Sequence, residues 1–356
     1  PQSLAPHPGV AIAARYAPAG DALEVGGDWY DAFALPGGRI ALVVGDVVGH
    51  GLDAAAAMGS LRTALAALAP HSAGPADLLS RLHAFTKGPN GTDFATVTYA
   101  VLDPATGELV YASAGHPPML AVAPDGSSRW LEGGRSIPLC VLGGRERPEA
   151  TTVLAPGTRL VLYSDGLVER RHEPMTAGLA RLDAVARAHP RAGVDELCDR
   201  IMEEMSRGRA SEDDAVVLCL ALVPVPAPGF RMVVPARPEQ MRHVRAAVRA
   251  WLEEQGRRAE EQSALLAIGE ACSNAIGHAY RGRAEGDVEI EIDERDGGLR
   301  VRVRDFGGWR APREDGGEGG RGMTIMRAVS HDLERRSGPG GTIVSFRLAA
   351  EPTPVP

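Results

Sequence analysis

The amino-acid sequence predicts an α+β protein of two domains, each built from a β-sheet covered by helices. In both halves of the 356-residue chain, apolar runs typical of strands alternate with amphipathic segments of helical periodicity. Between the halves, prolines at alternate positions of residues 224–229 deny a strand its donors and keep the chain extended. We therefore expect a first domain over residues 1–223, a linker over 224–229, a second domain over 230–350 and a tail over 351–356.

In the first domain, strand-like runs lie between turns rich in Gly, Pro and Asp, and two segments have helical periodicity. The predicted strands are Ile40–Val44, Phe94–Leu102, Leu109–Ala112, Leu160–Tyr163 and Ala215–Leu222. The predicted helices are Leu52–Leu68 and Val194–Met205. Together these segments predict a sheet core flanked by helices.

The second domain begins with two amphipathic helices, which the pattern places at Pro238–Glu254 and Glu261–Tyr280. Alternating strands follow at Val288–Ile292 and Leu299–Arg304. The stretch Gly316–Gly322 contains too many glycines for a helix or a strand, so the next helix is expected to begin near Met323. These elements predict an α/β layer.

Composition argues against several classes of function. The net charge of −8 and the aromatic content of 4% leave little of the basic surface that nucleic-acid binding requires. No apolar run approaches the roughly 20 residues that span a bilayer, and no N-terminal signal pattern is present, so we expect a soluble, cytoplasmic protein without a membrane segment. The four cysteines form no Cys-x-x-Cys pair, which argues against a disulfide framework or a zinc knuckle and predicts buried, reduced thiols.

Four acidic segments, far apart in the sequence, carry the chemistry of the first domain: Gly26–Asp31, Gly45–Gly51, Tyr163–Gly166 and Glu212–Asp214. Each places an Asp at or just past a strand-like run, beside Gly or a second acid. Carboxylate oxygens from several directions could therefore converge on Mg²⁺ or Mn²⁺. Two such ions can activate water for phosphate hydrolysis. A single Asp-Gly pair is equally typical of a turn, but four such segments in one domain favour a metal site.

Asp46 is the candidate for a carboxylate that bridges two ions. It follows the strand-like run Ala41–Val44, and the glycines on both sides leave space for the Val47 carbonyl to approach an ion. His50 and His116 are candidates for general acids because imidazole titrates near neutral pH. A single histidine in a Gly-rich turn, however, more often has a structural role.

The order of these motifs resembles the metal-dependent protein phosphatases of the 2C type, and most closely their bacterial branch, the stage II sporulation protein E-like and RsbU-like serine/threonine phosphatases. The resemblance rests on Gly-Gly-Asp-Trp-Tyr-Asp, Gly-Asp-Val-Val-Gly-His-Gly, Ala-Gly-His-Pro-Pro, Tyr-Ser-Asp-Gly-Leu-Val-Glu and Asp-Asp-Ala-Val, in that order. It implies an αββα sandwich in which two Mn²⁺ or Mg²⁺ ions activate water to attack a phosphoserine or phosphothreonine. The implied metal ligands are Asp28, Asp46 at the catalytic centre, the Val47 carbonyl, Asp165 and Asp213, with Asp214 as a neighbour.

In the second domain, Glu270 and Asn274 are four residues apart and so share one helical face. Asn can hold Mg²⁺ through its oxygen, and Glu can order or deprotonate an attacking group, although such a pair is also ordinary on a helix surface. Asp305 ends an alternating strand before two glycines, a geometry suited to accepting a hydrogen bond from an adenine amino group. The segment Gly319–Met323 opens a helix, whose free N–H groups can hold phosphates.

These elements in this order resemble the GHKL or Bergerat ATP-binding fold, and in particular the anti-sigma-factor serine kinases of the RsbW type, over Phe230–Ala349. The resemblance implies an α/β sandwich that binds ATP with Mg²⁺, with Glu270 as general base and Asn274 as Mg²⁺ ligand. Around the nucleotide it places Asp305, Gly307, Gly320, Gly322 and Thr342. One position departs from the family pattern, because Trp309 stands where the Asp-x-Gly-x-Gly box has its second glycine.

The two resemblances together imply a bifunctional regulator of partner switching. The first domain would dephosphorylate a phosphoserine or phosphothreonine on an anti-anti-sigma protein of the STAS type, and the second would bind ATP and phosphorylate the same class of partner. In an alternative, the second domain only binds ATP or a sigma factor as a regulatory module. A cyclase or another nucleotide enzyme in the first domain is a further alternative, because paired Asp sites also serve cyclases. The resemblance to the kinases also implies a homodimer formed through the second domain.

Overall fold

The computed structural model describes residues 4–18, 26–49, 51–87, 94–141, 146–190, 192–207, 213–223, 229–278, 286–295, 298–307, 319–338 and 340–348. The contacts within the chain divide it into two units: Ile12–Leu222 together with Pro1–Leu4, and Val223–Pro356 together with Ala5–Ala11. Residues 224–228 of the expected linker and the whole expected tail lie outside the described residues, and Gly229 is already part of a strand.

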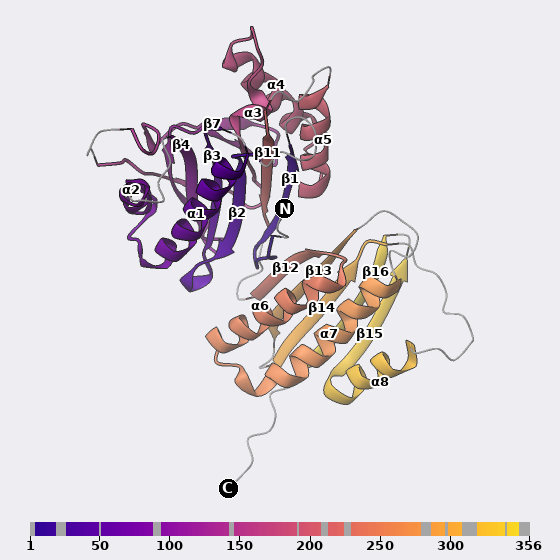
Figure 1. Ribbon diagram of the computed structural model, residues 1–356. Coiled ribbons are helices and arrows are strands. Elements are labelled where there is room, and N and C mark those ends of the chain that lie inside the picture. The colour runs from indigo at the N-terminus through magenta and orange to yellow at the C-terminus, as the bar shows by residue number, and fades with distance from the viewer. Residues whose placement is uncertain are drawn as a thin grey trace. The chain divides into compact units, whose positions relative to one another are not determined.

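The first domain contains two sheets with helices packed on their outer faces (Figure 1). One sheet has the strand order β2-β3-β4-β5-β8, with β9 also paired to β5, and the other has the order β1-β11-β10-β6-β7. Helices α1 and α2 pack on the first sheet, and α4 and α5 pack on β6 and β11 of the second. This is the αββα sandwich expected for the domain.

The strands of this domain are β1 (Val10–Ala17), β2 (Trp29–Ala34), β3 (Ile40–Val47), β4 (Ala95–Leu102), β5 (Glu108–Ala114), β6 (Met119–Val122), β7 (Ser128–Leu131), β8 (Arg135–Ser136), β9 (Ala150–Val153), β10 (Arg159–Tyr163) and β11 (Ala215–Leu222). The helices are α1 (Leu52–Leu68), α2 (Pro75–Thr86), α3 (Asp165–Val168), α4 (Met175–Ala188) and α5 (Val194–Ser206).

Strand β3 extends further than its apolar run predicts. It continues through Val47, so that Asp46 lies inside the strand, opposite Thr96 of β4. The reason is that β3 is hydrogen-bonded on both sides, to β2 and to β4. This backbone pairing continues past the apolar run and includes the polar residue Asp46. The candidate bridging carboxylate therefore has a rigid strand backbone.

Helix α1 differs from the expectation that no apolar run is long enough to span a bilayer. By length and composition alone, the helical run Leu52–His71 could cross a membrane. In the structure its buried residues Leu61 and Leu65 belong to the core under the first sheet, and Arg62 pairs with Asp31 of β2 at 2.8 Å. That is the arrangement of a helix that covers a sheet.

The second domain is one five-stranded sheet covered by helices α6, α7 and α8 on one face (Figure 1). Its strand order is β12-β13-β14-β16-β15. Alternate residues of the strands, such as Phe230, Met232 and Val234 of β12, are buried in the core with residues of the helices. The elements are β12 (Gly229–Pro235), α6 (Met241–Glu254), α7 (Glu261–His278), β13 (Asp287–Arg295), β14 (Gly298–Asp305), α8 (Gly319–Val329), β15 (His331–Gly338) and β16 (Gly341–Leu348).

Helix α8 begins at Gly319, so the expected start near Met323 is wrong by four residues. Glycine in a helix interior costs about 1 kcal/mol relative to alanine. Packing of α8 on α7, with Met326 fully buried in the core, offsets that cost. The other part of the Gly-rich stretch, residues 316–318, lies outside the described residues.

Candidate functional site

Three of the predicted carboxylates converge in the first domain. One oxygen each of Asp28, Asp46 and Asp165 lies within 4.8 Å of the other two. Asp28 precedes β2, whose first residue Trp29 is opposite Gly45 of β3, so Asp28 and Asp46 are neighbours in one sheet. Asp165 comes from the other sheet, because it follows β10 and opens α3. The sandwich thus brings together acids from both of its layers.

The Val47 carbonyl lies at the same place because Gly27 allows a close approach. The Val47 N–H donates to the Gly27 carbonyl at 3.2 Å, and a Cβ at Gly27 would lie only 1.9 Å from the Val47 oxygen. Any side chain at position 27 would therefore displace this carbonyl. The same hypothetical Cβ would lie 3.1 Å from Asp46 Oδ1, which places the carbonyl and the carboxylate side by side.

The cluster is electrostatically unfavourable without a cation. Burial raises the pKa of Asp28 to about 9, and the charges of Asp46 and Asp165 add to this, against a hydrogen bond with Ser164 that lowers it. Burial, the largest cause, and the charge of Asp165 likewise raise the pKa of Asp46, to about 7. Asp28 Oδ2 is buried and has no hydrogen-bond partner. A hard divalent cation would satisfy this oxygen and neutralise the neighbouring charges, so the residues present fit the expected Mn²⁺ or Mg²⁺ ions.

The two adjacent acids of the last motif occupy different environments. Asp213 is exposed and lies outside the group of three carboxylates, but its charge raises the pKa of Asp46. Asp214 is buried, its side chain packs on Gly26, and it hydrogen-bonds with Tyr16. Asp213 therefore lies at the rim of the site, and Asp214 links the Asp28 segment to β1. Glu212 lies outside the described residues.

The contacts of His116 give it a structural role and not the role of a general acid. Its Nδ1 lies 2.8 Å from Thr96 Oγ1 and its Nε2 lies 3.0 Å from the Tyr163 carbonyl. Because a carbonyl only accepts, Nε2 carries the proton and Nδ1 accepts from the threonine hydroxyl. Burial lowers the pKa of His116 to about 4. The neutral imidazole thus ties β4 to the end of β10, and His50 lies outside the described residues.

Ser164 contributes to the site although its motif points only to the following aspartate. It is fully buried, its Oγ accepts a hydrogen bond from the Val216 N–H at 2.9 Å, and it hydrogen-bonds with Asp28. One hydroxyl therefore connects two of the four acidic segments to strand β11, which follows the last of them. The sequence shows only that Ser164 precedes Asp165. Its role could not be predicted, because its partners Asp28 and Val216 are distant in the chain.

The predicted nucleotide residues of the second domain form two groups. On α7, Glu270 and Asn274 face the first turn of α8, because a Cβ at Gly322 would lie 2.7 Å from Glu270 Oε2 and 3.5 Å from Asn274 Nδ2. Gly320 belongs to the same turn of α8. The backbone of this first turn of α8 therefore lies near Glu270 and Asn274. A turn that binds the phosphates of a nucleotide would need this arrangement.

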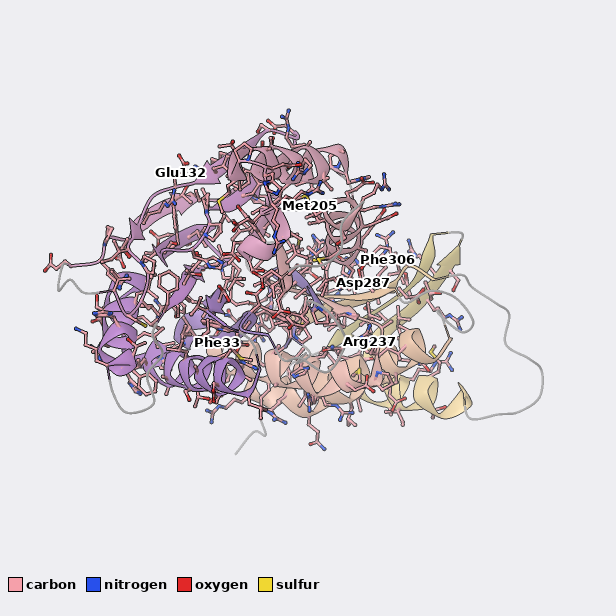
Figure 2. The ribbon with its side chains drawn as sticks, turned by 45° about the horizontal axis from the view of Figure 1, so that its top comes forward. Phe33, Glu132, Met205, Arg237, Asp287 and Phe306 are labelled. Atoms are coloured by element: carbon pink, nitrogen blue, oxygen red, sulfur yellow. The ribbon has the colours of Figure 1, made fainter. Side chains whose placement is uncertain are left out.

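The second group surrounds Asp305 at the end of β14. Asp305 Oδ1 accepts hydrogen bonds from the N–H groups of Gly307 and Thr342, both at 3.1 Å. Burial raises the pKa of Asp305, and these hydrogen bonds oppose the shift. Phe306 follows Asp305 and lies near Asp287 at the start of the neighbouring β13 (Figure 2). Trp309 lies outside the described residues.

Comparison with known proteins finds both domains. The family model Stage II sporulation protein E matches residues 36–223, and the model Histidine kinase-like ATPase domain matches residues 234–348. Phosphoserine phosphatase RsbP of Bacillus subtilis is 24% identical over 207 residues, which are 57% of this chain and 50% of that protein. Serine-protein kinase RsbW of Bacillus pumilus is 29% identical over 137 residues, which are 33% of this chain and 85% of that protein. The chain thus spans only half the length of RsbP.

Solved structures match both the fold and the domain order. The RsbU and RsbW domains of Rv1364c from Mycobacterium tuberculosis superpose with a TM-score of 0.61 and 33% identity, over 98% of this chain and 97% of that chain. The phosphatase domain of SpoIIE from Bacillus subtilis, with a fragment of its regulatory domain, gives a TM-score of 0.53 at 19% identity, over 61% of this chain and 65% of that chain, and shows the fold alone. The expected fold class is confirmed.

Mn²⁺ is expected to stabilise the first domain through the three carboxylates. At 100 times its dissociation constant it should add about 3 kcal/mol to the free energy of unfolding. Asp28→Asn should lose most of this gain and leave the metal-free melting temperature nearly unchanged, because a carboxyl with a pKa of about 9 is already protonated at pH 7. Thermal denaturation in EDTA and in MnCl₂ measures both. The exposed control Glu132→Gln (Figure 2) should behave as the wild type, and an undiminished Mn²⁺ shift in Asp28→Asn would contradict the site.

The buried His116 should make the protein sensitive to acid. Its folded-state pKa of about 4 is below the ordinary 6.5, so the stability it confers is present above pH 6.5 and is lost as the pH falls towards 4. Over this range the wild type should lose roughly 3 kcal/mol more free energy of unfolding than His116→Gln. Urea denaturation at several pH values tests the difference. Parallel pH profiles for the two proteins would show that His116 is not held in its neutral form.

Proposed function

Because the chain belongs to the stage II sporulation protein E family and carries a histidine kinase-like ATPase domain, we propose that it is a bifunctional regulator of partner switching. Its first domain is a metal-dependent phosphatase for phosphoserine or phosphothreonine. Its second domain binds ATP and acts as a serine kinase. The observation that carries the phosphatase is the convergence of Asp28, Asp46 and Asp165 in a domain of this family.

Asp28, Asp46, Asp165, the Val47 carbonyl and Asp213 would hold two Mn²⁺ or Mg²⁺ ions, which supply an activated water and Lewis acidity for attack on a phosphoryl group. Asp46 is suited to be the shared carboxylate. Its pKa responds to Asp165, Asp213 and Asp214, and it hydrogen-bonds with Asp28, so it is central among the acids. Ser164 and the Val47 N–H hold the surrounding backbone in place. His116 takes no part in proton transfer, since both of its nitrogens are engaged.

In the second domain, Asp305 is held in one orientation by two N–H donors and would accept a hydrogen bond from the adenine amino group. Asn274 would hold Mg²⁺, and Glu270 would orient or deprotonate the attacking serine hydroxyl. Backbone N–H groups in the first turn of α8, which includes Gly320 and Gly322, would bind phosphates, with Thr342 beside the nucleotide. The similarity to Serine-protein kinase RsbW supports this assignment.

The partner is a phosphorylated anti-anti-sigma protein of the STAS type, which the two domains would modify in opposite directions, in the cytoplasm. A sigma factor is a second partner, and the kinase-like domain is the proposed site of homodimer formation. One departure favours a second candidate function. Trp309 replaces a glycine of the family's adenine-binding box, which favours a domain that binds ATP or a sigma factor without transferring phosphate.

Asp46→Asn removes the proposed shared carboxylate. The variant is expected to hydrolyse para-nitrophenyl phosphate with Mn²⁺ at a rate lower than that of the wild type by a factor of 10² or more. ATP binding by the second domain should remain. Product release measured by absorbance, with calorimetric titration of a non-hydrolysable ATP analogue on the same preparation, tests both statements. Loss of both properties together would contradict two separate sites.

Glu270→Ala should retain nucleotide binding but lose phosphate transfer to a protein partner, because the side chain orients the acceptor and is not needed to hold ATP. The assay is transfer from radiolabelled ATP to a purified STAS-domain protein. Glu261→Ala, at the start of the same helix, is the control. Undiminished transfer by Glu270→Ala would refute its role, and absence of transfer by the wild type would favour the binding module.

A further inference from the structure

The first domain exposes large apolar side chains in an uneven distribution. In the described residues of this domain they are Val48, Leu52, Phe85, Phe94, Ile137, Val141, Val153 and Met175. Leu52 is 85% exposed and Val48 58%. Single exposed apolar residues are normal on a protein surface, but a group of them in one place marks an interaction site.

The segments that carry the first six of these residues are neighbours in space. The Val48 N–H donates to the Phe94 carbonyl at 3.3 Å, and the Leu139 N–H donates to the Ala95 carbonyl at 2.9 Å. The Cys140 N–H donates to Nδ1 of His83 on α2 at 3.3 Å. These bonds connect the segments of Val48, Phe94, Ile137, Val141 and Phe85, and Leu52 follows Val48 by four residues in the sequence. We call these six side chains the apolar rim.

The apolar rim lies at the metal-binding end of the sheet. Val48 follows Val47, whose carbonyl is a candidate ligand, and Ala95 pairs with Val47 in the ladder. Ile137 follows Ser136, which pairs with Ala114 at the same end of β5. Val153, in contrast, pairs with Glu108 at the other end of β5, six residues or roughly 20 Å away along the strand.

Charges of both signs lie around the apolar rim. Asp213 and Asp53 are exposed, on the last acidic motif and in the first turn of α1. The Arg147 guanidinium donates to the Ile137 carbonyl at 2.8 Å, and Lys87 is exposed two residues after Phe85. The charges therefore do not select one sign of ligand, whereas apolar groups of a ligand would gain from burial on the rim.

We propose that the apolar rim binds apolar side chains that flank the phosphoserine of a protein substrate. This rests on the proposed phosphatase function. A phosphoryl group that reaches Asp46 brings the neighbouring residues of its protein close to Val48 and Leu52, because Val48 follows the candidate ligand Val47 directly and Leu52 is the first residue after the segment Gly45–Gly51. The rim therefore selects substrates by the residues beside the phosphoserine, while the carboxylates act on the phosphate alone.

The test uses two synthetic phosphoserine peptides of equal length, with leucines or with serines on both sides of the phosphoserine, and para-nitrophenyl phosphate as a substrate without flanks. The variant is Leu52→Ser with Ile137→Ser, which changes two exposed side chains that take no part in metal binding. Val153→Ser is the matched control, as an exposed apolar residue at the distant end of the sheet. Melting temperatures in EDTA establish that all three proteins are folded.

The wild type should hydrolyse the leucine peptide with a kcat/KM about tenfold higher than the serine peptide, which corresponds to one well-buried apolar contact. The double variant should reduce this preference to twofold or less and keep its turnover of para-nitrophenyl phosphate. The control should keep both properties. A preference that survives in the double variant, or a wild type with no preference or no peptide turnover, overturns the proposal. Absence of turnover on para-nitrophenyl phosphate as well would show that the phosphatase function itself is wrong.

Discussion

The first domain depends on holding together three carboxyl groups that cannot all be ionised without a cation. Asp28, Asp46 and Asp165 come from both sheets of the sandwich, and burial together with the neighbouring charges raises the pKa of Asp28 and of Asp46. Hydrogen bonds from uncharged groups hold the surrounding segments in place. His116 connects Thr96, opposite Asp46, to Tyr163, two residues before Asp165. Ser164, which follows β10, connects Asp28 to Val216 of β11. The layers are thus joined by uncharged groups beside the acids, and Asp28 keeps a buried oxygen without a hydrogen-bond partner that a cation could satisfy.

The second domain holds its key carboxylate in a different way. Both hydrogen bonds to Asp305 Oδ1 come from backbone N–H groups, one from the following turn and one from β16. Such donors stabilise the ionised form and work against desolvation, so Asp305 keeps its orientation without a ligand. The two domains therefore respond differently to an empty site: the cluster in the first is under electrostatic strain, and the acceptor in the second is preorganised.

The sequence predicts those features that depend on local chemistry. Asp28, Asp46 and Asp165 stand beside glycines in short motifs, and α1 and β11 have clear periodicity, so their positions follow from nearby residues. Features that depend on distant partners could not be predicted in this way. The burial of Asp214 depends on Gly26 and Tyr16, the role of Ser164 depends on Val216, and the early start of α8 depends on its packing against α7. No local pattern distinguishes Asp213 from Asp214, because their difference in exposure arises only when the segments meet.

One motif links the apolar rim to the carboxylate cluster. In Gly26–Asp31, Asp28 enters the carboxylate cluster, and Asp31, three residues later, pairs with Arg62 on α1. Helix α1 carries Leu52 at its start and is joined to Asp46 by only five intervening residues. It is therefore held twice: by the chain at its N-terminus and by a half-buried ion pair near its middle. Because both attachments lead to strands that carry or directly follow candidate metal ligands, the surface that would select a substrate is coupled to the groups that would act on its phosphate.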